Sequence, residues 1–362
     1  MKVAMIAPIP PPYGGIANWV MLLDEYVKNI DGVEFVHINI APKSRTLDGR
    51  TLWERVVGQG FAMLGHNKTL KKIIKDDKID VIHMTTSGQL AIVRDIMMLK
   101  TAKKKKIPSV YHIRFGRIPE IAKKNTKEWK MIRKAMGLAT QVIAIDTTTL
   151  AAIKEYSPEV NVRYVPNPFD LGKLERTVVP SDELNRKEIV FVGWVIKTKG
   201  IEELLEAWEK KHFEYPDWKL RIIGPYSEEY YSEITSRFST ENVIFDGEKQ
   251  HDDAMRIVDS AEIFILPSYT EGFPNAVVEA MALKKPIIAS AVGAIPDMIN
   301  TCGIVIPPKD ANAIAEAFDK LLPDESLRKE MGLKARARME EEYTIEMVFD
   351  TYTKIWTEVS SK

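Results

Sequence analysis

The chain has 362 residues, of which 45% are apolar and 28% charged, enough for about two average domains with buried cores. That composition excludes a largely disordered or fibrous protein. No apolar run approaches the roughly 18 residues of a membrane span, and the opening MKVAMIAPIPPPYGG lacks the pattern of a secretory signal. The single cysteine, Cys302, excludes a disulfide framework and a metal site built from cysteines. We therefore expect a cytoplasmic protein.

The net charge is zero, but the charges are unevenly divided. Residues 1–180 hold 29 Lys and Arg against 17 Asp and Glu, and residues 181–362 hold 22 against 34. This excess of basic residues indicates that the first half faces an anionic partner. Two solvated surfaces of different composition would give the same counts, so both interpretations stay open at this point.

Short β-branched runs alternate with longer amphipathic stretches, a pattern typical of parallel sheets covered by helices. The expected strands of the first half are Lys2–Ala7, Val33–Ile38, Val81–His83, Ser109–His112, Gln141–Ile145 and Val162–Val165. Those of the second half are Glu188–Gly193, Lys219–Gly224, Asn242–Asp246, Ile263–Leu266, Pro286–Ala289 and Gly303–Ile306. We therefore expect an α/β fold with two Rossmann-like doubly wound domains that face a central cleft.

The expected domain boundaries follow breaks in this pattern. Residues 166–187 show neither helical nor strand periodicity, and a helix expected over Ile345–Val359 follows a break at Tyr343. We expect domains over residues 1–170 and 171–342, and a last helix within 343–362 that packs back toward the first domain.

The most informative segment is SYTEGFPNAVVEAMA, which begins at Ser268 after a predicted strand. Pro274 stands where the first turn of a helix begins, a place that proline favours. A glycine loop that leads into a helix offers backbone N–H groups and the positive end of the helix dipole to a phosphate. Glu271 in the loop and Glu279 in the helix could both accept hydrogen bonds from sugar hydroxyls. An ordinary strand–loop–helix with two surface glutamates is the alternative.

Three other segments also follow predicted strands. Gly14 and Gly15 let the backbone approach a ligand closely, and His112 ends a strand two residues before Arg114. The segment FVGWVIKTKG carries two lysines, Lys197 and Lys199, between a strand and a helix. A lysine in that place can pair with a phosphate group. A turn without a ligand, a core histidine and solvated surface lysines are the ordinary alternatives.

Seven segments in this order resemble the retaining glycosyltransferases of family 4, which adopt the GT-B fold. They are PYGGIA, YHIRFG, RYVPNPFD, FVGWVIKTKG, LRIIGP, EGFPNAVVEAMA and GAIPDMI, and the resemblance covers nearly the whole chain. It implies an acceptor-side first domain and a nucleotide-sugar-binding second domain. It further implies that Glu279 binds the nucleotide ribose, that Glu271 and His112 contact the donor sugar, and that Lys199 binds phosphate.

The resemblance implies His112, Glu271 and Lys199 as catalytic residues. The donor-binding residues that it implies are Gly14, Gly15, Arg114, Lys197, Lys199, Glu271, Gly272, Phe273, Pro274, Asn275 and Glu279. One departure stands out, because the family has an arginine after the first glycine of FVGWVIKTKG and this chain has Trp194. Either Lys197 or an arginine from elsewhere replaces that cation, or the activity is altered.

We expect no metal site and no cofactor other than a nucleoside-diphosphate sugar as donor. The acidic pairs Asp76-Asp77 and Asp252-Asp253 stand near helix or loop starts rather than at strand ends, where a cation bridging phosphates would be held. Lys199 and helix dipoles would supply the positive charge instead.

Basic residues gather in the segments Leu52–Ile74, Lys100–Lys106 and Ala122–Lys134, the last interleaved with Trp129 and Met131. Basic amphipathic helices with aromatic residues are typical of peripheral association with an anionic membrane surface, here the inner face. Helices packed on their own domain with a solvated lysine face are the alternative. Nucleic acid is a poorer explanation, because no recognition motif accompanies the lysines.

The sequence therefore favours a metal-independent glycosyltransferase of polysaccharide or cell-surface glycan biosynthesis, acting on a glycan or polyprenyl-linked acceptor. The resemblance implies that it retains the anomeric configuration. A sugar-nucleotide epimerase or phosphorylase on the same fold is the enzymatic alternative, since fold alone does not decide chemistry. A non-catalytic, two-domain sugar-binding protein is the third possibility.

Overall fold

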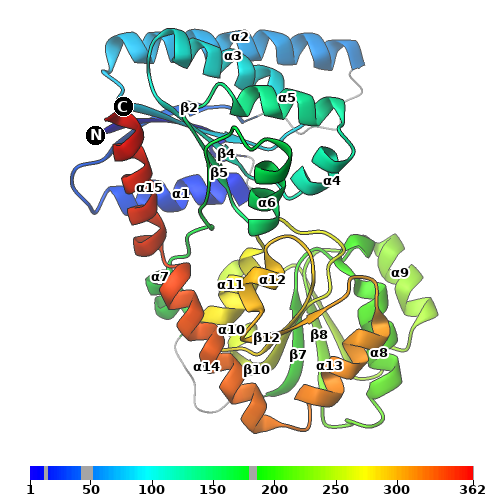
Figure 1. The fold of residues 1–362 in the computed structure, drawn as a ribbon. Coiled ribbons are helices and arrows are strands. Elements are labelled where there is room, and N and C mark those ends of the chain that lie inside the picture. The colour runs from blue at the N-terminus through cyan, green and yellow to red at the C-terminus, as the bar shows by residue number, and fades with distance from the viewer. Residues whose placement is uncertain (12–14, 42–51, 179–185, 362) are drawn as a thin grey trace. The chain divides into compact units, whose positions relative to one another are not determined.

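The computed structural model describes residues 1–11, 15–41, 52–178 and 186–361 (Figure 1). The chain divides into two compact units. The first unit comprises Met1–Pro168 together with Ile345–Lys362, and the second comprises Phe169–Thr344. Among the described helices, none is both long and apolar enough to cross a membrane.

The first unit is built on a six-stranded parallel sheet with the order β2-β1-β3-β4-β5-β6. Its strands are β1 (Lys2–Ala7), β2 (Glu34–Asn39), β3 (Val81–Thr86), β4 (Ser109–Ile113), β5 (Gln141–Ala144) and β6 (Val162–Tyr164). Its helices are α1 (Gly15–Val27), α2 (Leu52–Asp76), α3 (Ala91–Lys104), α4 (Ile118–Lys123), α5 (Lys127–Met136), α6 (Thr147–Tyr156) and α15 (Ile345–Ser360).

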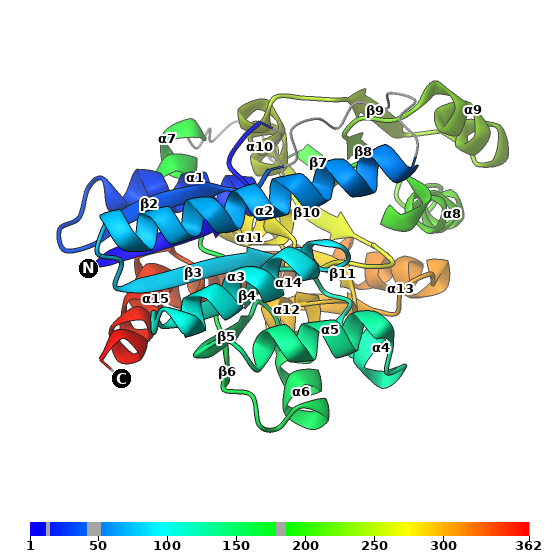
Figure 2. The same ribbon diagram turned by 90° about the horizontal axis from the view of Figure 1, so that it is seen from above.

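Both faces of this sheet are buried, because successive side chains of a strand point to opposite faces. Ala4 and Ile6 of β1 belong to the core under α2–α6, which includes Leu70 of α2. Val3 and Met5 belong to the opposite core, under α1 and α15. The last helix of the chain is thus part of the first unit, and its apolar side covers one face of the first sheet (Figures 1 and 2).

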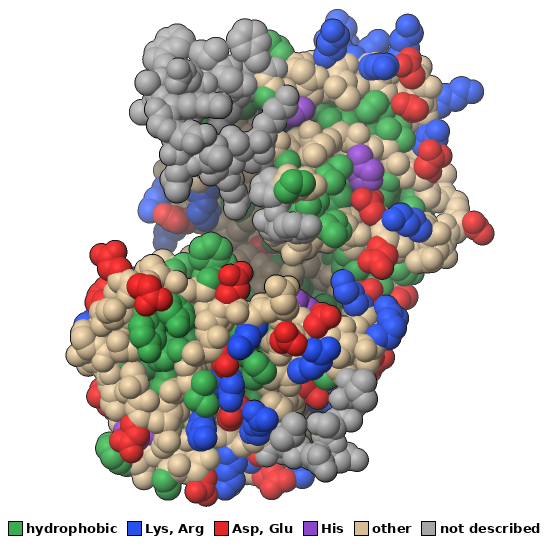
Figure 3. Space-filling model, turned by 180° about the vertical axis from the view of Figure 1, so that it is seen from behind, with side chains coloured by type: hydrophobic (Ala, Val, Ile, Leu, Met, Phe, Trp, Pro, Cys, Tyr) green, Lys and Arg blue, Asp and Glu red, His purple; other side chains and the backbone are tan. Residues whose placement is uncertain are grey.

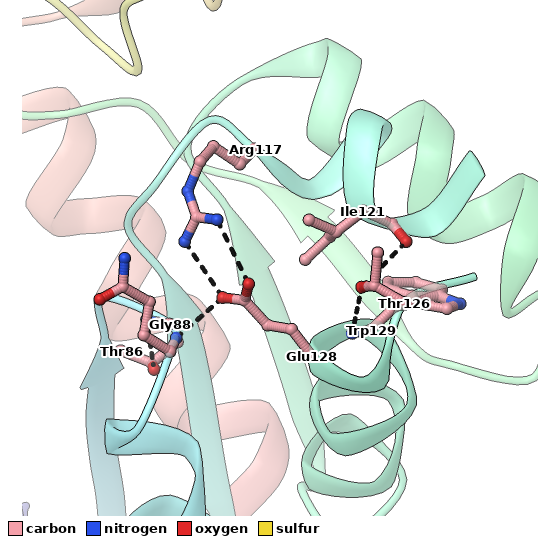
Figure 4. A network of polar contacts seen from close by, with 8 residues as sticks. Thr86, Gly88, Arg117, Ile121, Thr126, Glu128 and Trp129 are labelled. Carbon is pink, nitrogen blue, oxygen red and sulfur yellow. Dashed lines mark hydrogen bonds and ion pairs between the residues drawn. The ribbon is translucent and has the colours of Figure 1, made fainter. Parts of the chain in front are cut away.

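The start of α5 is held by a polar network (Figure 4). The Thr126 side chain caps the helix by accepting from the backbone N–H of Trp129 at 3.1 Å. Glu128 accepts two hydrogen bonds from the Arg117 guanidinium, at 3.1 and 3.2 Å, and a third from the backbone N–H of Gln89 at 2.8 Å. This carboxylate therefore ties α5 to the start of α4 and to the loop after β3.

The second unit repeats the arrangement with a parallel sheet of order β12-β11-β10-β7-β8-β9. Its strands are β7 (Arg186–Val192), β8 (Lys219–Ile223), β9 (Val243–Gly247), β10 (Ala261–Leu266), β11 (Ile287–Ser290) and β12 (Gly303–Ile306). Its helices are α7 (Leu171–Thr177), the short 3₁₀ helix η1 (Lys197–Lys199), α8 (Ile201–Lys211), α9 (Glu228–Arg237), α10 (His251–Ser260), α11 (Asn275–Ala282), α12 (Ile295–Ile299), α13 (Ala311–Leu321) and α14 (Glu325–Glu342).

Every strand expected from the sequence is present in these two sheets. The largest difference in extent is at β3, which runs past His83 to Thr86. The α/β fold class with two doubly wound sheets is confirmed.

Candidate active site

The loops at the carboxyl edge of the second sheet pack tightly on one another. The segment after β7 includes Gly200 at φ 73°, where a Cβ atom would stand 2.1 Å from the carbonyl oxygen of Pro267. The backbone N–H of Tyr269 donates to the Thr198 carbonyl at 2.9 Å. Since ligands of open parallel sheets bind beyond the carboxyl ends of the strands, this edge is the place to look for a site.

Within this edge, Lys199 and Glu271 form an ion pair with 2.6 Å between Nζ and Oε1. Lys199 ends η1 and Glu271 lies in the loop after β10, and the Glu271 side chain is only 11% exposed. The structure thus brings two of the three expected catalytic residues into direct contact. An ammonium and a carboxylate held together in this way can approach both the phosphate and the hydroxyl groups of one ligand.

The glycine loop leads into α11 as expected. Pro274 is the residue before the helix and Asn275 its exposed first residue. Gly293, at φ 56°, lies so close that a Cβ atom would stand 2.5 Å from the Gly272 carbonyl oxygen, which also accepts from Ala294 N at 2.9 Å. The loop after β11 therefore holds the glycine loop in place. Phe273 is buried and packs at 5.6 Å between ring centroids against Tyr343, so only its backbone can face a ligand.

Glu279, on α11, accepts a hydrogen bond from His251 at 3.0 Å between Oε1 and Nε2. The Glu279 side chain is 14% exposed, whereas His251, the first residue of α10, is 58% exposed. This hydrogen bond raises the pKa of His251 above its usual value. Our sequence analysis did not identify His251. Its place directly after β9, at the same sheet edge, was the signal available.

In the first unit, the structure describes Gly15 as the first residue of α1, whereas Gly14 lies outside the described residues. Arg114 follows β4 and donates to Asn167 Oδ1 at 2.6 Å from Nη2. Its guanidinium lies 4.4 Å from the ring centroid of Trp19, within cation–π range.

His112 is fully buried rather than exposed at the sheet edge. It is the penultimate residue of β4, and its ring lies 5.4 Å from that of Trp19 and 5.9 Å from that of Tyr352. The alternation of side chains along the strand turns His112 onto the face covered by α1 and α15. Burial, followed by the nearby Arg114 charge, holds the pKa of His112 well below its usual value.

No group of three or more His, Cys, Asp or Glu side chains in the described parts of the chain is arranged to hold a metal ion.

Comparison with known families gives two adjacent matches. Residues 35–173 match the sequence model of Glycosyltransferase Family 4, and residues 177–338 match that of Glycosyl transferases group 1. The chain belongs to the group 1, family 4 glycosyltransferases. The resemblance that the motifs indicated is therefore confirmed.

Named relatives include the capsular polysaccharide biosynthesis glycosyltransferase CapM of Staphylococcus aureus, 30% identical over 61% of this chain and 62% of CapM. The first curated relatives are matched over less than two thirds of their own length. A GDP-mannose-dependent monoacylated alpha-(1-6)-phosphatidylinositol monomannoside mannosyltransferase of Corynebacterium glutamicum is 24% identical over 96% of this chain and 95% of its own.

Among solved structures, Alr3699/HepE of Anabaena in complex with UDP superposes with a TM-score of 0.73 at 16% identity, over 99% of this chain and 100% of HepE. A likeness at this identity shows the fold, which is the GT-B fold of the glycosyltransferases.

The position where the glycosyltransferase family carries an arginine is occupied here by Trp194, whose side chain is 66% exposed. Lys197, the nearest alternative cation, is 65% exposed and pairs with Glu202 on α8 at 3.3 Å. Glu202 also pairs with Arg237 at 2.9 Å. The structure therefore places Lys199, and not Lys197, in contact with Glu271.

Proposed function

We propose that this protein is a retaining, metal-independent glycosyltransferase that moves a sugar from a nucleoside-diphosphate sugar to a glycan or lipid-linked acceptor. The contact that carries the proposal is the ion pair of Lys199 with Glu271 beside the glycine loop. The printed names of relatives support the substrate classes, since CapM serves capsular polysaccharide biosynthesis and HepE was solved with UDP. The mannosyltransferase relative uses GDP-mannose, so the nucleotide base of this chain is a matter for experiment.

In this proposal Glu279 binds the ribose hydroxyls and Glu271 a hydroxyl of the donor sugar. Lys199 and the N-terminus of α11 face the diphosphate, because both present positive charge at the same sheet edge. Asn275 and the backbone of the glycine loop, including Gly272, complete the donor site.

The reaction breaks the bond between the anomeric carbon and the phosphate oxygen, and the electron pair leaves with the nucleoside diphosphate. Negative charge therefore grows on that phosphate in the transition state, where Lys199 stabilises it. The acceptor hydroxyl attacks the anomeric carbon from the same face, and its proton passes to an oxygen of the departing diphosphate as the new glycosidic bond forms. The ammonium and the helix N-terminus supply the positive potential that a divalent ion supplies in other transferases.

The nucleotide is identified by thermal shift with UDP, GDP, ADP and their sugars, since a ligand at a hundredfold its dissociation constant adds about 2.7 kcal/mol of stability. Nucleotide release that requires an acceptor supports transfer. Release that requires inorganic phosphate instead would point to a phosphorylase, and interconversion of sugar nucleotides to an epimerase. Binding without turnover would point to a sugar-binding protein. Inversion at the anomeric carbon, or loss of activity in EDTA, contradicts the mechanism.

We also propose that the first unit binds an anionic membrane surface through one layer of helices. The described lysines of α2, the end of α3 and α5 come from segments far apart in the sequence, yet these helices lie side by side (Figure 2). Exposed lysines in this layer include Lys71, Lys72, Lys75, Lys100, Lys103, Lys104, Lys105, Lys106, Lys127, Lys130 and Lys134. Lys and Arg side chains project along the upper edge of the first unit in Figure 3.

A groove of about 580 Å³ lies between α2 and α3 in this layer. Four lysines line it, Lys71, Lys100, Lys104 and Lys105, together with the apolar side chains of Val93, Ile96 and Met97. Anionic lipid headgroups match this combination of charge and apolar surface. The aromatic residue expected to contact the membrane, Trp129, is instead buried in the core, so attraction between the lysines and lipid phosphates carries the binding.

A further inference from the structure

A chain of ring nitrogens runs through the first unit from the last helix to His112. The indole Nε1 of Trp356, on α15, lies 3.0 Å from Nδ1 of His83, on β3. His83 Nε2 in turn lies 3.1 Å from His112 Nδ1. All three side chains are fully buried, so water does not compete for these hydrogen bonds.

The donor and acceptor roles in this chain follow from Trp356. An indole N–H can only donate, so Nδ1 of His83 is the acceptor and the hydrogen of His83 is on Nε2. His83 Nε2 therefore donates to His112 Nδ1, which puts the hydrogen of His112 on Nε2. Both rings are neutral in this arrangement, because burial lowers the pKa of His83 to about 3 and that of His112 well below its usual value.

At the far end, His112 Nε2 lies 3.5 Å from Arg114 Nη1. With the hydrogen of His112 on Nε2, two donors face one another, which explains why this contact is the longest of the three. The buried Arg114 Nε makes no hydrogen bond of normal geometry to the described side chains and backbone groups, and the Tyr352 hydroxyl is the oxygen that lies beside this guanidinium. An oxygen acceptor at this point would accept from both His112 and Arg114.

Without the Trp356 N–H, the hydrogens of His83 and His112 would each move to the other ring nitrogen. Arg114 could then donate to a bare His112 Nε2, His112 Nδ1 would donate to His83 Nε2, and the hydrogen of His83 would move to Nδ1. The neutral pair can satisfy only one of its two end donors, the indole of Trp356 or the guanidinium of Arg114. The contact is 3.0 Å at the indole and 3.5 Å at Arg114, so the indole is the donor that is satisfied and the hydrogen of His112 lies on Nε2.

We propose that Trp356 and His83 are positioning residues that keep the hydrogen of His112 on Nε2, so that His112 and Arg114 present donors to one oxygen acceptor. That this acceptor belongs to the substrate rests on the proposed function, whereas the relay of hydrogen bonds from Trp356 through His83 to His112 does not. The relay also gives α15 a role beyond covering the sheet, since it carries the one residue of the relay that can only donate.

The relay is tested by long-range ¹H–¹⁵N correlation spectra of the full chain labelled in its six histidines, with no ligand present. We expect His112 to carry its hydrogen on Nε2 only, and not to titrate between about pH 5.5 and 8.5. In Trp356→Phe, which keeps a ring but loses the N–H, we expect a signal from hydrogen on Nδ1 of His112. Trp208→Phe is the matched control, since it removes a buried indole hydrogen bond of 3.2 Å to Glu241 O in the second unit. It should leave the His112 signals unchanged.

A second pair of variants covers the case in which Trp356→Phe fails to fold. His83→Gln retains one acceptor and one donor, whereas His83→Leu retains neither, so only the glutamine should keep His112 in the Nε2–H form. Once the donor is identified, we expect kcat to fall about tenfold in Trp356→Phe and His83→Leu, with KM changed less than about twofold. In His83→Gln, part of the lost kcat should be retained. Unchanged His112 signals in folded Trp356→Phe or His83→Leu would overturn the relay. Altered signals with unaltered kcat would overturn its catalytic role, and absence of any donor turnover by the wild type would count against the proposed function alone.

Discussion

His251 and Glu279 are 28 residues apart in the chain, yet His251 Nε2 lies 3.0 Å from Glu279 Oε1. The contact joins the first residue of α10 to the second turn of α11, at the sheet edge where the donor is proposed to bind. A carboxylate held in one orientation loses less entropy when it binds a ligand. This pair therefore links the protonation of an exposed histidine to the group that we expect to hold ribose.

Glu279→Ala is expected to weaken nucleotide binding by about a hundredfold, because two hydrogen bonds from ribose hydroxyls to a charged carboxylate are lost. Calorimetry with the nucleotide found by thermal shift measures this affinity. Glu330→Ala is the control, since Glu330 is an exposed glutamate on α14 that pairs with Lys334 at 2.7 Å. Unchanged affinity in folded Glu279→Ala would contradict the ribose assignment.

The contribution of His251 to the stability of the second unit should depend on pH. Its pKa is raised by Glu279, so the folded state binds the proton more tightly than the unfolded state. The stabilisation is then complete below the unfolded pKa of about 6.5 and is lost as pH rises through the folded pKa. Since His251 is 58% exposed, we expect its protonation to add less than about 1 kcal/mol to the free energy of unfolding. In urea unfolding, the wild type should be more stable than His251→Ala at about pH 5.5, and the two should have equal free energies of unfolding at about pH 9. Divergence only at high pH would refute the pairing.

Lys199→Ala is expected to slow donor turnover by on the order of a hundredfold, because in the proposed site the departing diphosphate loses the positive charge of Lys199. Lys197→Ala is the matched control. It removes the same group two residues away, but Lys197 is 65% exposed and pairs with Glu202. Glu271→Ala should lower kcat more than it raises KM, since we propose that Glu271 contacts the reacting sugar. Equal losses in Lys197→Ala and Lys199→Ala would contradict the proposal that Lys199 alone carries the phosphate role.

Gly200→Ala and Gly247→Ala compare two causes of destabilisation in the second unit, an unfavourable backbone conformation and a steric clash. Both glycines have positive φ, 73° and 68°, but nothing lies within 4 Å of a Cβ at Gly247, whereas a Cβ at Gly200 meets the Pro267 carbonyl oxygen at 2.1 Å. We expect about 1 kcal/mol of destabilisation for Gly247→Ala and roughly 3 kcal/mol for Gly200→Ala. Urea unfolding of the second unit measures both. Similar values would mean that the loops after β7 and β10 do not pack as described.

The first unit should sediment with anionic vesicles at low salt and be released as salt rises, because exposed charges are screened within about 8 Å at physiological ionic strength. Replacing Lys100, Lys104 and Lys105 by Glu should abolish this binding, because each basic residue lost removes roughly 1 kcal/mol of membrane-binding free energy. The same charge change at Lys320, Lys329 and Lys334 in the second unit is the control. Equally poor binding to anionic and neutral vesicles would leave the lysines as a solvated surface.

The strands and helices could be predicted because the sequence patterns that define them extend over only a few neighbouring residues. Short β-branched runs and amphipathic stretches define strands and helices from a few neighbouring residues, so β1 and β12 match the expected bounds and the other strands differ at their ends. The glutamate motif and the lysine of FVGWVIKTKG were found for the same reason, as each lies within a short segment after a strand.

Side-chain partners could not be predicted in this way. Lys199 meets Glu271 only because β7 and β10 are neighbours in the second sheet, an order that no local pattern contains. The sequence places His112 at the end of a strand. Which face its ring occupies, and that it is buried, depend on α1 and α15 packing over that face.

The sequence by itself thus determined the two α/β sheets, the family and the segments that we propose carry the chemistry. Only the tertiary structure decided that Trp129 is a core residue, that His251 holds Glu279, and that Trp356 reaches His83 across 273 positions of chain. The physical reason is that periodicity and turn chemistry act over a few residues, whereas hydrogen-bond partners and burial are set by which distant elements pack together.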